Sequence, residues 1–136
     1  SGYCSDSTRT YVIGECSPDF QSKYEILKEA QELSIQAVSN DISAEQLDAV
    51  ARDHLGKNDL AKYFIHRTGH GIGMETHEEP YIVLGNKNQI KDGNAFSIEP
   101  GFYIEGKYGA RIEDIVIKKD GKSVNCNNTT KDLVFI

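Results

Sequence analysis

Apolar residues in the first third of the chain recur at the three- and four-residue spacing of an amphipathic helix. Ser17 can cap the N-terminus of this helix, Pro18 suits its first turn, and Asp19 adds a favourable negative charge there. We therefore predict a helix over residues 18–39 that ends before Asn40. Its apolar positions are Ile26, Leu27, Ala30, Leu33, Ala37 and Val38.

A second amphipathic helix is predicted from Ser43 to about Leu55. Ser43 and Gln46 have the spacing of a capping box, and Gly56 favours termination directly after Leu55. His54 falls on the apolar stripe of this helix, so we interpret it as structural. The stripe consists of Leu47, Val50, Ala51 and Leu55.

Runs of β-branched and aromatic residues predict strands in the rest of the chain. The first is Tyr3–Ile13 (YCSDSTRTYVI), and the dipeptide Asp120-Gly121 is a strong hairpin turn near the other end. Two helices followed by an antiparallel sheet predict one α+β domain over residues 1–136. The remaining predicted strands are 81–84, 95–98, 102–104, 111–118, and short ones near 123–125 and 133–136.

Composition excludes several classes of function. The net charge of −6 argues against a nucleic-acid partner, because phosphate binding requires a basic face. No apolar run approaches the roughly 20 residues that span a membrane. The three cysteines are odd in number and form no CxxC pair, so we expect buried or inert thiols in a reducing cytoplasm.

The segment His66–Pro80, HRTGHGIGMETHEEP, predicts a functional site. It contains three of the four histidines, with glycines between them that let the backbone approach a ligand. A single histidine would more simply be a surface or core residue, and a polar turn with incidental histidines is the alternative interpretation here. We interpret the three glutamates of the segment mostly as solvated loop charges, although Glu78 could orient His77.

Two glutamates interrupt apolar runs in the β half. Glu99 ends FSIEPG and Glu113 lies within ARIEDIVI, and a buried carboxylate requires a nearby cation. That cation is either Arg111 or a metal ion. Histidines combined with several carboxylates and no thiolate favour Mn, Fe, Co or Mg over structural zinc, and such carboxylates can also bridge two ions. Because HExxH is absent, the pattern predicts a metal-dependent hydrolase of another type.

Four blocks of the sequence resemble the motifs of the pita-bread metallopeptidases. They are YCSDSTRT, HRTGHGIGMETHEEP, FSIEPGFYI and ARIEDIVI, in this order between residues 3 and 117. The HxxxH spacing, the RIED block and the EPG corner resemble Xaa-Pro aminopeptidase and Xaa-Pro dipeptidase (prolidase) more than methionine aminopeptidase. The resemblance implies a curved antiparallel sheet with two packed helices and hydrolysis of Xaa-Pro peptide bonds.

The resemblance also implies roles for individual residues. Asp6 and Glu113 would bridge two divalent ions, with manganese the first choice and cobalt, zinc or iron the others. His70 and Glu99 would complete the ligands of one ion, and Glu99 would also carry the proton. Two further histidines, His77 and His66, would contact the tetrahedral intermediate and the proline side of the peptide substrate. Arg111 would orient the carboxylates from outside the ligand set.

One expected ligand, an aspartate on a strand ahead of Asp6, has no counterpart. We therefore expect the C-terminal part of a catalytic domain, incomplete at its N-terminus, that holds one metal ion and is inactive alone. A second copy of the chain could cover its open sheet edge as a homodimer. The alternatives are a non-catalytic peptide- or protein-binding member of the fold, a methionine aminopeptidase, and a metal-free creatinase-like hydrolase, which the intact carboxylates argue against.

Overall fold

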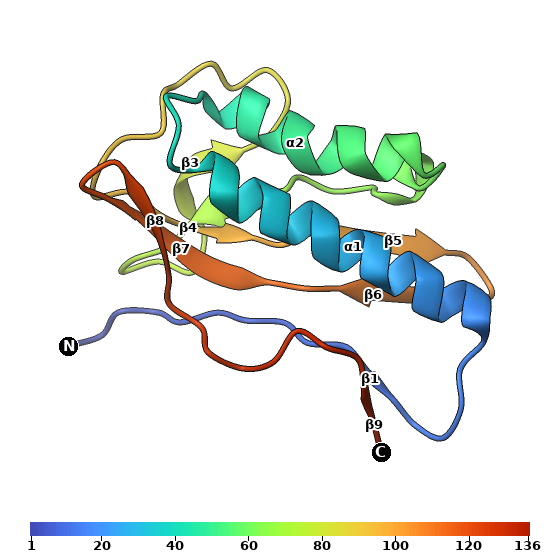
Figure 1. Cartoon of the computed structure of the whole chain (residues 1–136). Coiled ribbons are helices and arrows are strands. Elements are labelled where there is room, and N and C mark those ends of the chain that lie inside the picture. Colours follow the sequence, from blue (N-terminus) through green and yellow to red (C-terminus); the bar gives the residue numbers. More distant parts are fainter.

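The computed structural model describes all residues, 1–136, and has the predicted α+β architecture. Two antiparallel-packed helices cover one side of a five-stranded antiparallel sheet, and the chain termini run along the opposite side (Figure 1). The helices are α1 (Pro18–Ala37) and α2 (Ala44–Lys57), followed by the short 3-10 helix η1 (Ala61–Tyr63). No helix has the length and apolarity that a membrane crossing requires.

The five-stranded sheet has the order β3-β2-β4-β7-β8. Two small sheets accompany it: the hairpin β5-β6 and the parallel pair β1-β9, which joins the two ends of the chain. The strands are β1 (Tyr11–Val12), β2 (Gly69–Gly71), β3 (Glu78–Ile82), β4 (Ala95–Ile98), β5 (Gly101–Ile104), β6 (Tyr108–Arg111), β7 (Asp114–Lys119), β8 (Lys122–Asn125) and β9 (Val134–Phe135).

Both helices begin as the sequence predicts. The Ser17 hydroxyl accepts a hydrogen bond from the backbone N–H of Phe20, and the capping box between Ser43 and Gln46 is complete. Leu33 was predicted to face the core and is instead 41% exposed. The polar Gln31 instead faces the core from α1. It is fully buried, and its side chain donates a hydrogen bond to Asp114.

Two apolar clusters form the core under the helices. One joins α1 and the C-terminal half of α2 to β5 and β6, around Tyr24, Leu27, Leu55 and Phe102. The other joins the end of α1 and the start of α2 to the large sheet, around Leu47, Phe96, Ile98 and Val116. The helices therefore pack against both the large sheet and the β5-β6 hairpin.

The predicted long strand Tyr3–Ile13 was wrong. Only Tyr11–Val12 forms a strand, and one isolated bridge between Thr8 and Glu113 ties the earlier part to the rest of the chain. A content of β-branched and aromatic residues cannot distinguish a paired strand from an extended segment held largely by side chains. Here Arg9 bonds Glu113, Asp114 and Thr129, and the side chains of Thr8 and Thr10 add further hydrogen bonds.

The predicted strand 111–118 is two strands, because the chain leaves β6 at Arg111 and joins the large sheet only at Asp114. Glu113 lies at this crossing. The predicted strand 81–84 begins earlier, at Glu78, while β4, β5 and β8 agree with prediction. At the hairpin turn, Asp120 and Gly121 both have positive φ, as a two-residue turn of this kind requires.

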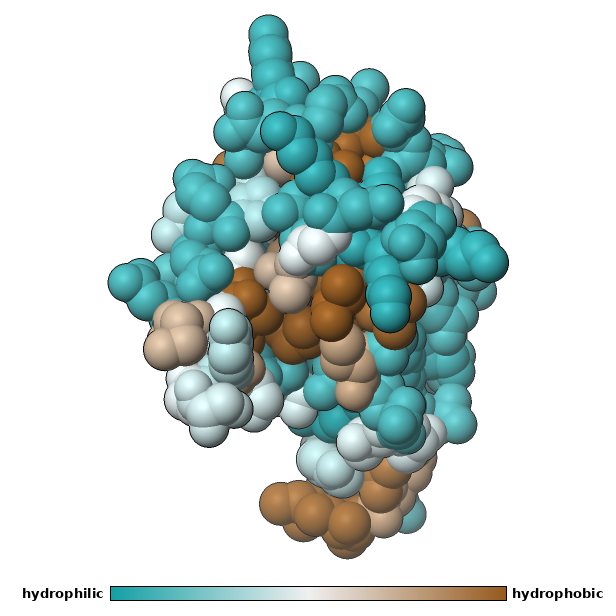
Figure 2. Space-filling view, turned by 90° about the vertical axis from the view of Figure 1, so that its left-hand side faces the viewer, coloured by the Kyte–Doolittle hydropathy of each residue, from teal (hydrophilic) through white to brown (hydrophobic).

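Four exposed apolar side chains gather where the two ends of the chain pair. We call Tyr11, Ile13, Phe135 and Ile136 the terminal patch; their exposures range from 50% to 84%. Figure 2 shows a hydrophobic region at the lower end of the molecule, where Figure 1 places β9 and the C-terminus. All three cysteines are unpaired, and Cys126 is exposed rather than buried.

Asp114 is fully buried and receives donors from four separate segments, so we expect it to be critical for stability. Its carboxylate accepts from Arg9 (2.6 Å), Gln31 (3.0 Å) and Asn125 (2.9 Å) and pairs with Lys131 (3.2 Å). Substitution Asp114→Asn leaves two cations facing a neutral amide. We expect a loss of about 3 kcal/mol in the free energy of unfolding at pH 7, measured by urea titration.

The pH dependence of this loss provides a second test. Burial by itself would raise the pKa of Asp114, but the hydrogen bonds from Arg9, Asn125 and Gln31 outweigh it and hold the pKa below its usual value. The stabilisation is therefore complete above about pH 5 and disappears as the pH falls through the lowered pKa. The difference in the free energy of unfolding between wild type and Asp114→Asn should become smaller below about pH 4. The matched control Asp53→Asn, at an exposed position, should have nearly the same free energy of unfolding as wild type at every pH.

Candidate metal centre

All seven residues singled out by the sequence line one cavity on the side of the sheet opposite the helices. The cavity has a volume of about 660 Å³, and Arg67 and Val83 complete its lining. The seven residues are Asp6, His66, His70, His77, Glu99, Arg111 and Glu113.

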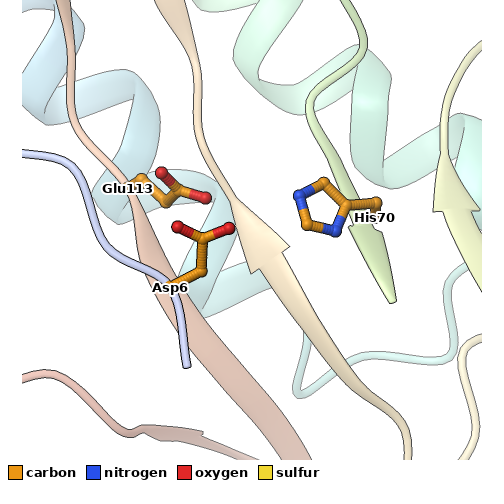
Figure 3. A group of neighbouring side chains, drawn as sticks. All are labelled: Asp6, His70 and Glu113. Carbon is orange, nitrogen blue, oxygen red and sulfur yellow. The ribbon is translucent and has the colours of Figure 1, made fainter. Parts of the chain in front are cut away.

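Three of these side chains converge. The nearest donor atoms of Asp6, His70 and Glu113 all lie within 4.8 Å of one another. In Figure 3 the carboxylates of Asp6 and Glu113 lie next to each other, and the imidazole of His70 faces them across the gap. Asp6 comes from the N-terminal segment, Glu113 from the crossing between β6 and β7, and His70 from the middle of β2.

Glu99 joins this group through His70. Its Oε1 lies 3.1 Å from His70 Nε2 and accepts a hydrogen bond from the hydroxyl of Ser97 at 3.0 Å. Arg111 approaches the other oxygen, Oε2, at 3.9 Å. Ser97 also accepts from the backbone N–H of His70, so one hydroxyl fixes both the strand that carries the imidazole and the carboxylate beside it.

The central strand β2 can carry His70 at this point because glycines flank it. A Cβ added at Gly69 would lie 1.8 Å from the Ser97 carbonyl oxygen, and one at Gly71 would lie 2.2 Å from the Glu79 carbonyl oxygen. Any side chain at these two positions would push β4 or β3 away. The alternation of glycine and histidine is therefore a packing requirement of the sheet as well as a feature of the site.

Hydrogen bonds define the orientation of the His70 imidazole. Nδ1 lies 3.0 Å from the Gly71 carbonyl oxygen, which can only accept, so Nδ1 carries the proton. In the neutral ring Nε2 then presents its lone pair to the Glu99 carboxylate and to the two acids of Figure 3. This is the usual arrangement of a metal-binding histidine, whose other nitrogen donates to a carbonyl.

The electrostatics of the acids also favour a cation. Burial raises the pKa of Glu113, and the charges of Glu99 and Asp6 raise it further, against an opposing hydrogen bond from Thr8. Three carboxylates and one lone pair thus face a common space with Arg111 as the nearest fixed positive charge. A divalent ion would neutralise this repulsion, so the donor set fits a metal site.

His77 and His66 lie on either side of this group. His77 is exposed, and its ring lies against the His70 ring in a tilted arrangement, with 3.9 Å between the centroids and 52° between the planes. His66 lies edge-on to Phe64, and its Nε2 is 3.2 Å from the hydroxyl of Tyr103. His54 is remote from the cavity and pairs with Glu29 at the contact between the helices, in agreement with its structural interpretation.

Comparison with known proteins identifies the family. Residues 1–120 match the profile of metallopeptidase family M24. The chain belongs to this family. It is 53% identical over 135 residues to the probable dipeptidase PepE of Mycobacterium tuberculosis, covering 99% of the chain and 36% of that protein. It is 49% identical over 136 residues to the Xaa-Pro dipeptidase of Lactobacillus helveticus, covering 99% and 37%.

Solved structures agree with this assignment. The crystal structure of a prolidase from Thermococcus sibiricus matches with a TM-score of 0.96 and 51% identity, covering 99% of this chain and 37% of that one. The pita-bread fold of the M24 peptidases is therefore confirmed. The chain spans little more than a third of the length of these relatives. Membership of the family implies divalent metal ions, which the donor set accommodates.

Several residues of this M24 site were missed by the sequence analysis. Thr8 bonds the Glu113 carboxylate, Ser97 bonds Glu99, and Arg67 and Tyr103 lie beside His77 and His66. Ser97 was detectable, because it lies two residues before Glu99 on β4 and so shares its face. Nothing in the spacing of Thr8, Arg67 or Tyr103 indicates their contacts, which arise only when distant segments meet.

We expect the metal-stripped chain to bind Mn²⁺ at one site, measured by isothermal titration calorimetry. Substitution His70→Ala removes the nitrogen donor and should weaken binding by more than about tenfold. The matched control His54→Ala should bind as wild type does, because His54 pairs with Glu29 between the helices and does not line the cavity. Equal affinity of His70→Ala and wild type would show that the predicted ligand set is wrong.

Proposed function

We propose that this chain carries metal-ligating and substrate-contacting residues of an enzyme that hydrolyses Xaa-Pro peptide bonds, with dipeptides as substrates. The observation that carries the proposal is the convergence of Asp6, His70 and Glu113, with Glu99 beside them, in one cavity. Relatives named dipeptidase, Xaa-Pro dipeptidase and prolidase support the substrate class. Asp6, His70, Glu99 and Glu113 are the proposed metal ligands, and Asp6 and Glu113 the proposed bridge between two ions.

The proposed roles follow from which atoms each residue leaves free. Bound metal ions would supply an activated water and polarise the scissile carbonyl. The Ser97 hydroxyl donates to Oε1 of Glu99. Oε2 is therefore the proposed oxygen that accepts a proton from the attacking water and passes it to the leaving proline nitrogen. Arg111, 3.9 Å from Oε2, is proposed to orient this carboxylate.

His77 is proposed to stabilise the developing negative charge on the substrate oxygen. The Arg67 guanidinium, which can only donate, lies 3.5 Å from Nδ1 of His77. Nδ1 therefore accepts, and Nε2 carries the proton that a carbonyl oxygen needs. His66, between the aromatic rings of Phe64 and Tyr103, forms an apolar wall that suits the proline ring.

The donor set also supports a proposal about the isolated chain. Its converging donors suffice for one ion, whereas a dinuclear centre with two bridging carboxylates requires further ligands. We therefore propose that the 136 residues bind one ion and do not turn over substrate by themselves. Manganese is the proposed ion, with cobalt, zinc or iron as the alternatives. The proposed compartment is the cytoplasm, which the three unpaired thiols support.

Substitution Glu99→Gln tests the proposed hydrolysis in a form of the protein that turns over Xaa-Pro dipeptides. The amide keeps the size of the side chain and loses the base, so kcat should fall by at least about 100-fold while the circular dichroism spectrum is unchanged. Glu75→Gln, an exposed acid of the histidine segment, is the matched control and should keep full activity. Wild-type turnover by Glu99→Gln would refute the assignment.

We also propose that the chain forms a homodimer through the terminal patch. The pair β1-β9 has unpaired outer edges, and its exposed apolar side chains would be covered by a second copy. Light scattering after size-exclusion chromatography should detect a species with the mass of a dimer, and the fraction of dimer should rise with protein concentration. Ile13→Asp should shift the protein to monomer, whereas Leu84→Asp, equally exposed but outside the patch, should not. A monomer at all concentrations would contradict the proposal.

A further inference from the structure

An ion pair on α2, between the buried Asp48 and the partly exposed Arg52, lies outside the cavity and has no role in the function proposed above. Asp48 is 1% exposed, and its two oxygens accept from Nε (2.9 Å) and Nη2 (3.0 Å) of Arg52, one turn later. A pair of this kind contributes little to a helix, and replacing a buried pair by apolar residues is often neutral or stabilising. The position of Arg52 therefore calls for another explanation than the stability of α2.

The remaining donors of Arg52 bind the backbone of the segment that leads into the site. Nη1 donates to the carbonyl of Phe64 and Nη2 to the carbonyl of His66, both at 3.0 Å. This segment lies between η1 and β2 and belongs to no helix or strand. The planar guanidinium thus holds two carbonyls that are two residues apart, and it also stacks at 4.3 Å on the Phe64 ring.

Asp48 fixes the end of the same segment. Its Oδ1 accepts from the backbone N–H of Thr68 at 3.0 Å and from the Thr68 hydroxyl at 2.8 Å. The carbonyl of Thr68 in turn accepts from the backbone N–H of Glu99 at 2.8 Å. One ion pair therefore determines where the chain enters β2 and, through a single hydrogen bond, where β4 delivers Glu99.

His66 lies between these two anchor points. Its carbonyl is held by Arg52, and its ring is packed edge-on against Phe64, whose carbonyl Arg52 also holds. The neighbouring side chain, Ile65, points away from the core and is 75% exposed. The ring itself makes two hydrogen bonds, to the Arg67 carbonyl and to the Tyr103 hydroxyl. A change in the path of this segment would therefore turn His66 out of the cavity.

We propose that Asp48 and Arg52 are positioning residues for the substrate pocket, which act by holding His66 towards the cavity. Neither residue touches the metal ligands or lines the cavity. The inference rests on the proposed function only where it assigns the proline side of the substrate to His66. The orientation of His66 itself can be measured without any substrate.

The variants Arg52→Lys and Arg52→Gln separate positioning from general stability. Lysine keeps the charge next to Asp48 but, as a single ammonium, cannot reproduce the planar fork to two carbonyls. Glutamine loses both the charge and the fork. The stability of the fold should therefore fall in the order wild type, Lys, Gln, whereas the orientation of His66 should be lost equally in both variants. Lys23→Gln, which breaks an exposed pair one turn apart on α1, is the matched control.

The first readout is the NMR signal of the His66 ring and of the backbone amides from 64 to 68 in this chain. Both Arg52 variants should shift or broaden these signals by a similar amount and leave those of β7 unchanged. If the His66 signals stay at their wild-type positions, or if the shifts follow thermal stability and are small in Arg52→Lys, the pair is structural only and the proposal is overturned.

The second readout is kinetic, in a form of the protein that hydrolyses Xaa-Pro dipeptides. Both Arg52 variants should raise KM by about tenfold while kcat changes less than about threefold, because the misplaced group binds substrate and carries no proton. An unchanged KM in both variants would overturn the link to the pocket. Absence of Xaa-Pro hydrolysis in the wild type would refute the proposed function, and the NMR readout would still decide the role of Arg52.

Discussion

The Asp114 carboxylate is the interaction on which the rest of the structure depends. It is buried beneath α1 and binds side chains from the N-terminal segment, α1, β8 and the C-terminal segment. The N-terminal segment forms one isolated backbone bridge, Thr8 with Glu113, and Arg9 adds hydrogen bonds from its guanidinium that hold the segment against the crossing between β6 and β7. Glu113 directly precedes Asp114, and Asp6 lies shortly before Arg9 in the sequence. The Arg9–Asp114 ion pair therefore brings Asp6 and Glu113 together.

The site uses the same principle at its other walls. Buried polar groups outside the cavity connect segments that have no regular backbone pairing, and the side chains of those segments then face the cavity. Asp114 and Arg9 do this for Asp6, and the pair on α2 does it for the entrance to β2. Ser97 reinforces the paired strands β2 and β4, where it bonds both the backbone of His70 and the carboxylate of Glu99. Burying these polar groups costs desolvation energy. Every buried side-chain nitrogen and oxygen has a hydrogen-bond partner, and this limits the cost.

Much of the fold was predictable because it rests on local physics. Capping residues and apolar spacing define α1 and α2, and short β-branched runs bounded by glycine define β4, β5 and β8. The errors occurred where tertiary contacts override local pattern. The segment 3–13 has the composition of a strand, but most of it is held by side chains such as that of Arg9. ARIEDIVIK has the composition of one strand but divides at Ile112 and Glu113.

The candidate site was predictable for a different reason. An acid within an apolar run is costly unless it has a partner, so Glu99 and Glu113 were conspicuous in the sequence. His70 stood out as one of three histidines in a glycine-rich segment, and Asp6 was assigned through the resemblance of its block to the family motif. Thr8, Asp48, Arg52 and Asp114 were not, because a threonine in an extended segment and an acid or arginine on a helix are common on any surface. Their importance arises from burial and from hydrogen-bond partners up to 105 residues away, which only the folded chain brings into contact.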